Sequence, residues 1–289
     1  MRELLKKLRK YEIQIRSVVQ NRMHGDFHSI FKGSGLEYED VRSYQYGDDV
    51  RAIDWNVTAK GHGTYIKTFK EEKEQQILFI VDVSASQNIG KIGHTKADKV
   101  KEICGVLTLS AIKETASVGL ICFSDQKELF IEPKKGATHG YQMILNLFKL
   151  QPQSIKTNLS NALKFTLGFL KKKSMVILVS DFIDLDYERN LMALAQKHEL
   201  VVIHISDARE INFPKFGIIP MFDKETKKTI WINSSSSKFQ EKVAMSFKES
   251  QTKLEEICRK YQASYINIDT SEDYVLKLIK LFRLKKLYH

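Results

Sequence analysis

ILFIVDVSAS, residues 77–86, is the stretch of sequence that decides the fold. Its first half, residues 77–81, is a continuous apolar run, which is typical of a parallel strand covered by helices on both faces. Its second half ends that strand in polar side chains. Comparable apolar runs occur at 118–123, 175–179, 200–205 and 265–268. We therefore expect a buried parallel sheet built around residues 77–81.

Stretches with helical spacing of apolar residues separate these strands. Such spacing occurs in 100–111, 144–148, 159–170, 191–196, 239–261 and 275–282. Strands that alternate with helices predict an α/β fold, with a doubly wound, mostly parallel sheet and helices on both faces. The connection at 206–236 is too long for a simple crossover. It holds two apolar runs around a turn-like stretch, which predicts a β-hairpin insertion.

The N-terminal part has a different character. Residues 2–23 have the apolar stripe of an amphipathic helix, which would either pack on the protein, as we expect, or make peripheral contact with a membrane surface. Residues 33–70 are polar, aromatic and rich in turn signals. We therefore expect a helical and irregular module at 1–74 and the sheet domain at 75–289. The segment Gly47–Trp55 is either a capped, packed turn, which we favour, or a docking surface.

The composition is that of a soluble globular protein. The 289 residues are 43% hydrophobic and 28% charged. Three cysteines without paired spacing predict buried thiols, and the lack of a long apolar stretch or secretory signal predicts a cytoplasmic protein. The net charge of +11 makes nucleic acid or an anionic membrane a rival partner. Because the lysines are scattered along helices, a solvated basic surface is the expectation.

Oxygen-bearing side chains follow the predicted strands at their carboxyl ends, where ligands bind in open α/β sheets. Asp82, Ser84 and Ser86 follow the first strand, Thr157 precedes a helix, and Asp181 follows the strand at 175–179. Hard cations prefer such all-oxygen ligands, and Mg²⁺ keeps water where the protein supplies few charges. The sequence therefore predicts a site for Mg²⁺ or Mn²⁺ with an open position for an incoming carboxylate.

Each of these residues also has a purely structural interpretation. Asp82 and Ser84 could form a side-chain turn at the strand end. Thr157 could be the N-cap of the following helix, and Asp181 could cap the helix after its strand. The occurrence of all three elements at strand ends favours the metal site.

Two motifs then resemble known families. Asp82-x-Ser84-x-Ser86, a later Thr157 and a later Asp181 resemble the metal-ion-dependent adhesion site of the von Willebrand factor type A domain. The stretch YQYGDDVRAIDWNVTAK ahead of that motif resembles the bacterial domain-of-unknown-function family 58, over roughly residue 33 to the end. That resemblance implies a type A-like fold and an association with MoxR-type AAA+ ATPases. One departure is Gln87, where related domains usually carry Met.

These patterns favour a protein-binding function. We expect a divalent-cation-dependent module, without catalytic residues, that binds a partner's acidic side chain. The family resemblance implies that this partner is a MoxR-type ATPase, for which the module would be an adaptor. One alternative is a Mg²⁺-dependent phosphatase with Asp82 as nucleophile, but its DxDx[TV] pattern needs a second Asp where Ser84 stands. The other alternative is a basic binder of nucleic acid or membrane surfaces, of which nucleic acid is the less expected partner.

Overall fold

A six-stranded mixed sheet forms the centre of the computed structural model, which describes residues 36–61, 63–71, 75–91, 93–211, 216–223 and 228–286. The strand order is β12-β9-β8-β3-β6-β7. The strands are β3 (Gln76–Asp82), β6 (Ser117–Phe123), β7 (Lys127–Lys134), β8 (Met175–Ser180), β9 (Glu199–Ser206) and β12 (Ser264–Asp269). All neighbours pair in parallel except β7, which runs antiparallel to β6 at one edge. The predicted α/β fold is confirmed.

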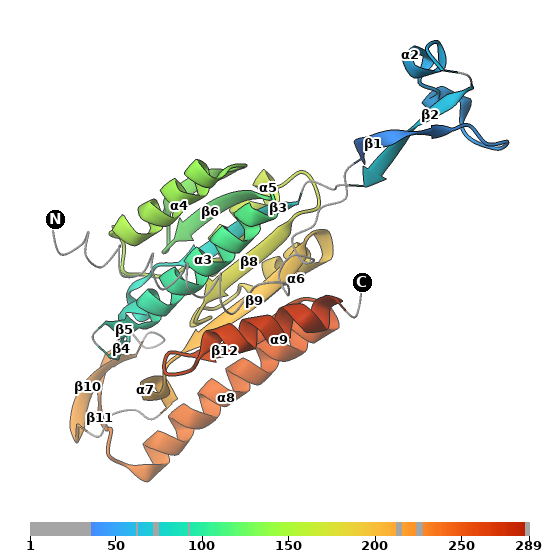
Figure 1. The fold of residues 1–289 in the computed structure, drawn as a ribbon. Coiled ribbons are helices and arrows are strands. Elements are labelled where there is room, and N and C mark those ends of the chain that lie inside the picture. The colour runs from blue at the N-terminus through green and yellow to red at the C-terminus, as the bar shows by residue number, and fades with distance from the viewer. Residues whose placement is uncertain are drawn as a thin grey trace.

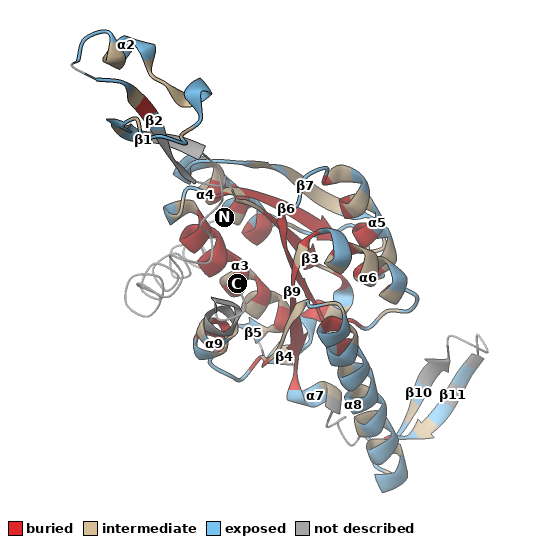
Figure 2. Ribbon diagram, turned by 90° about the vertical axis from the view of Figure 1, so that its right-hand side faces the viewer, coloured by how far each residue is buried: buried red, intermediate tan, exposed pale blue. Residues whose placement is uncertain are grey.

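Helices cover both faces of this sheet (Figure 1). One face packs against α3 (Lys96–Lys113), α4 (Ala137–Lys149) and α9 (Tyr274–Lys286). The other packs against α5 (Leu159–Phe169), α6 (Glu188–Lys197) and α8 (Ser237–Lys260). Alternate residues of each strand point to opposite faces, so Phe79 joins the first cluster and Ile80 the second. Figure 2 shows the buried strands between these helices.

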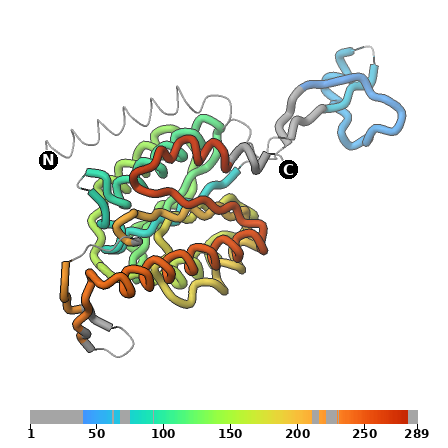
Figure 3. The backbone as a smooth tube through the Cα atoms, turned by 90° about the horizontal axis from the view of Figure 1, so that it is seen from below, coloured from blue at the N-terminus to red at the C-terminus, as the bar shows by residue number. Residues whose placement is uncertain are grey.

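The segment ahead of the sheet is a β-hairpin with short helical turns. Strand β1 (Leu36–Ser43) pairs antiparallel with β2 (Tyr65–Glu71), and η1 (Val50–Ala52) and α2 (Trp55–Thr58) lie between them. The sequence analysis did not predict this pairing, because a partner strand about twenty residues away leaves no local pattern. The hairpin projects from the sheet domain in Figures 1 and 3. The amphipathic stretch 2–23 lies outside the described residues.

The predicted hairpin insertion is present after β9. A short helix α7 (Ala208–Ile211) comes first, and strands β10 (Ile218–Asp223) and β11 (Lys228–Asn233) then pair antiparallel. Three short elements, η2 (Ala85–Asn88), β4 (Gly90–Lys91) and β5 (His94–Thr95), connect β3 to α3. Within the described residues, no helix has both the length and the apolar character that a membrane crossing requires.

Candidate cation site

The loops at the carboxyl edge of the sheet are joined by backbone hydrogen bonds. The amide of Val83 donates to the carbonyl of Phe123 at 2.9 Å, and the amide of Ala85 donates to the carbonyl of Ile155 at 3.2 Å. The amide of Asn158 donates to the carbonyl of Ser124 at 3.0 Å. The loop that carries Thr157 therefore lies between the ends of β3 and β6, as the candidate site requires.

The DVSAS motif forms a compact arrangement of oxygen atoms. Asp82 is buried, and its Oδ1 accepts the amide of Ser84 at 2.9 Å. Its Oδ2 accepts the hydroxyl of Ser180 at 2.7 Å. The hydroxyls of Ser84 and Ser86 lie 3.0 Å apart. The side-chain turn that was the structural alternative for Asp82 is therefore present, and it orients the carboxylate beside the two serines.

The spacing of the two serine hydroxyls fits a divalent cation. Neighbouring ligands of an octahedral ion with bonds of about 2.1 Å lie about 3.0 Å apart. The Ser84 and Ser86 oxygens have this separation. In the described part of the chain, no three His, Cys, Asp or Glu side chains come together as a metal cluster. Neutral hydroxyls would therefore have to supply direct ligands.

Asp181 has a partner that the sequence did not reveal. The ammonium group of Lys96, which is completely buried, donates to Asp181 Oδ2 at 2.7 Å and to Glu210 Oε1. Lys96 is the first residue of α3, whose start is fixed by a capping box between Thr95 and Asp98. The capping box can be recognised in the local sequence, but it does not predict that the side chain of Lys96 is buried.

The buried carboxylates outnumber the buried ammonium. Asp82, Asp181, Asp207 and Glu210 are four carboxylates whose side chains are buried or nearly so, and among the described residues Lys96 is the one buried lysine. Burial and the charge of Asp181 raise the pKa of Asp82 to about 6. Burial also raises the pKa of Glu210. A divalent cation at the serines would supply the missing positive charge.

The helix-cap alternatives for Thr157 and Asp181 are wrong. Helix α5 has Asn158 as its N-cap, whose side chain accepts an α5 amide at 2.9 Å. Helix α6 has Tyr187 as its N-cap, and Asp181 Oδ1 instead accepts the amide of Ile183 at 3.2 Å. Thr157 is half-buried, and among the described residues its hydroxyl makes no hydrogen bond to the other candidate ligands.

Gln87, the residue that departs from the family pattern, is buried beside the motif. Neither its amide nitrogen nor its amide oxygen has a hydrogen-bond partner among the described residues. A buried amide without partners is costly, by about 1–3 kcal/mol for each unsatisfied group. This position therefore keeps hydrogen-bonding capacity for a water molecule or another ligand.

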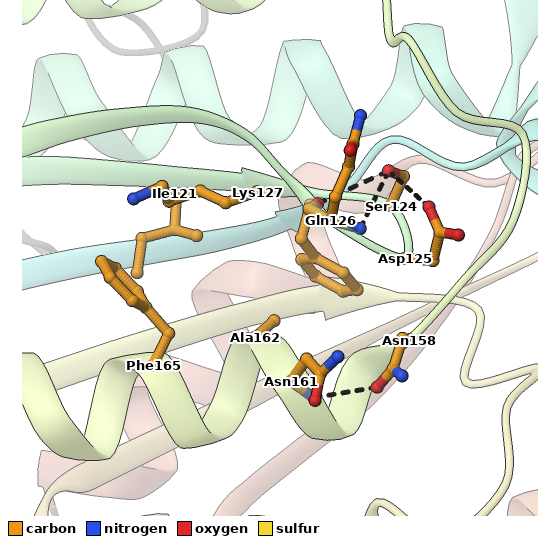
Figure 4. A pocket seen from close by; sticks show the side chains of 10 residues that line it. Ile121, Ser124, Asp125, Gln126, Lys127, Asn158, Asn161, Ala162 and Phe165 are labelled. Carbon is orange, nitrogen blue, oxygen red and sulfur yellow. Dashed lines mark hydrogen bonds between the residues drawn. The ribbon is translucent and has the colours of Figure 1, made fainter.

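A cavity of about 230 Å³ lies between the end of β6 and the start of α5 (Figure 4). Its apolar wall includes Ile121, Phe123 and Phe165, and its polar rim includes Asn158 and Asn161. The carbonyl of Phe123 also accepts the amide of Val83 in the motif, whereas the amide of Asn158 donates to the carbonyl of Ser124. The end of β6 therefore borders both the cavity and the loop that carries the motif.

Comparison with known proteins shows the family of this chain. A family described as "Protein of unknown function DUF58" matches residues 40–253. The uncharacterized protein Rv1480 of Mycobacterium tuberculosis is 25% identical over 76% of this chain and 70% of its own length. Similar solved structures include the conserved hypothetical protein BatB from Bacteroides thetaiotaomicron, with 14% identity over 74% of this chain and 98% of that one and a TM-score of 0.46. Another is the SpRpn10 VWA domain, with 12% identity, 71% and 93% coverage and a TM-score of 0.39.

Proposed function

This chain belongs to the DUF58 family, and we propose that it is a protein-binding module that holds one divalent cation, Mg²⁺ or Mn²⁺, at the carboxyl edge of its sheet. Ser84 and Ser86 would be direct ligands, with Thr157 direct or through water. Asp82 and Asp181 would supply charge through bound waters. A cation held by so few charges keeps an open position that attracts a partner's carboxylate.

The spacing of the serine hydroxyls carries this proposal. They lie 3.0 Å apart next to a buried, oriented carboxylate, in a region where buried carboxylates outnumber the buried ammonium group of Lys96. Uncompensated buried charge is strongly destabilising, so a bound cation would stabilise the folded protein. A nucleophilic role for Asp82 is less well supported, because both of its oxygens already accept hydrogen bonds.

On the basis of the family resemblance, we propose that the partner is a MoxR-type AAA+ ATPase. We also propose that the protein acts in the cytoplasm. Loss of a charge pair at the centre of an interface costs about 2–5 kcal/mol, or roughly 30- to 4000-fold in affinity. Chelation of the cation is therefore expected to weaken partner binding by at least about 30-fold.

Mn²⁺ titration followed by electron paramagnetic resonance tests the cation site. One bound ion per chain is expected in the wild type, with much weaker binding in Asp82→Ala and Ser84→Ala and a smaller loss in Thr157→Ala. Ser236→Ala is the matched control, since that hydroxyl caps no amide of α8. Equal Mn²⁺ binding by all variants would remove the site. If the partner still binds in excess chelator, the partner interface does not depend on the cation.

A further inference from the structure

Three large apolar side chains stand exposed around the candidate cation site. We call Ile155, Ile183 and Leu185 the collar; each is between 51% and 81% exposed. The Ile155 carbonyl accepts the amide of Ala85 in the motif, and the Ile183 amide donates to Asp181. Exposed apolar side chains that gather around one polar site are typical of a protein interface.

The loop that carries two collar residues is held in a strained conformation. Phe182 and Asp186, on either side of it, have positive φ angles of 55° and 59°, which bulky residues rarely adopt. Asp184 fixes the loop, because its Oδ2 accepts the amide of Leu159 at 2.6 Å and its Oδ1 that of Leu185 at 2.8 Å. Such strain persists only where surrounding contacts enforce it, and it concentrates at functional sites.

A second exposed apolar cluster lies on the β1–β2 hairpin, and it contains an acidic side chain. We call residues 45–55 the hairpin tip. Tyr46, Val50 and Trp55 are from 61% to 105% exposed, and Asp49 beside them is exposed as well. Gly47, with a φ of 104°, allows the turn that presents Tyr46. Asp49 Oδ1 accepts the amide of Arg51 at 2.9 Å, and a carboxylate has a second oxygen for a metal ion.

The hairpin tip and the collar lie at opposite ends of the sheet. The hairpin precedes the amino end of β3, whereas Asp82 ends that strand. A seven-residue strand spans about 20 Å. Figure 1 shows the hairpin pointing away from the strand ends that lead into β4, β5 and α7. A tip therefore meets the collar of another molecule more readily than its own.

We propose that the hairpin tip of one copy docks on the collar of a second copy, with Asp49 as the carboxylate that completes the cation site. This inference rests on the proposed function, and the ATPase would compete for the same collar. In this contact, the apolar side chains around Asp49 pack on the apolar side chains of the collar. The negative charge of Asp49 then pairs with the positive charge of the cation. The contact is head to tail and leaves a free tip and a free collar, so it builds chains unless the rotation closes a ring.

Sedimentation velocity of the full chain tests this self-association. With Mn²⁺, we expect species that grow with protein concentration, and with chelator a monomer. Asp49→Asn keeps a side chain that caps helices well and should weaken association at least about 30-fold. The double variant Ile183→Ser/Leu185→Ser should also be monomeric, and because these side chains are exposed it should fold. Glu132→Gln, another exposed acid, is the matched control.

Mixing variants gives the sharpest outcome. Asp49→Asn keeps its collar and Asp82→Ala keeps its tip, so each alone should be monomeric and an equimolar mixture with Mn²⁺ should stop at a dimer. Mn²⁺ binding, measured on the same samples, separates the two proposals. A wild type that binds Mn²⁺ yet stays monomeric, or that associates equally well after Asp49→Asn, overturns the docking of the tip. A wild type that binds no Mn²⁺ overturns the cation site itself.

Discussion

Replacement of Lys96 by Met tests the charge balance at the strand ends. The Lys96 side chain is completely buried, and its ammonium group is the cation that Asp181 and Glu210 share. Met retains most of the volume of the side chain and removes its charge. Two buried carboxylates then lose their partner, which typically costs about 3–5 kcal/mol. We expect the free energy of unfolding in chelator at neutral pH to fall by this amount.

Urea unfolding followed by circular dichroism measures this loss. Lys113→Met is the matched control, because this exposed lysine lies on the same helix and should change the free energy of unfolding by less than about 1 kcal/mol. The added change Asp181→Asn should recover part of the loss, since it removes one unpaired charge. Mn²⁺ should stabilise Lys96→Met more than the wild type, because the cluster is then more negative. A loss below about 1 kcal/mol for Lys96→Met would refute this account of the charge balance.

Three further outcomes are expected from unfolding measurements. The pKa of Asp82, raised to about 6 by burial and by the nearby charge of Asp181, means that its ionisation opposes folding as the pH rises from about 4 through 6. In chelator at pH 8, Asp82→Asn should therefore be up to about 3 kcal/mol more stable than the wild type, with no gain below pH 4. Asn158→Ala removes the N-cap of α5 and should cost about 1 kcal/mol without changing Mn²⁺ affinity. Gly119→Ala would place a Cβ within 2.8 Å of Pro133 and should lower the free energy of unfolding by about 1–3 kcal/mol. Gly168→Ala adds a Cβ in open space on a helix and should raise the free energy of unfolding by about 0.5–1 kcal/mol.

The sheet and the meeting of its strand ends could be predicted from the sequence, because both follow from local patterns. A run such as residues 77–81 is apolar at every position only when helices cover both faces, and the alternation with helical stripes implies parallel strands. Parallel strands end at one edge, so residues directly after them, such as Asp82 and Asp181, come close together. The chemistry of the candidate ligands could therefore be inferred from the sequence alone.

The contacts that determine charge and helix capping depended on tertiary structure. Lys96 and Glu210 lie far apart in the sequence, and a buried lysine has the same residue type as the many exposed ones. Asn158, and not Thr157, is the N-cap of α5, although both residue types are suited to that position. The position of Asn158 is fixed by the hydrogen bond from its amide to the carbonyl of Ser124, just after β6. The sequence by itself determined which strands exist and what polar atoms follow them. Burial, ion pairing and the exposure of the collar and the hairpin tip depend on packing between segments that are distant in the sequence. The spacing of residues within one segment does not determine the energies of those contacts.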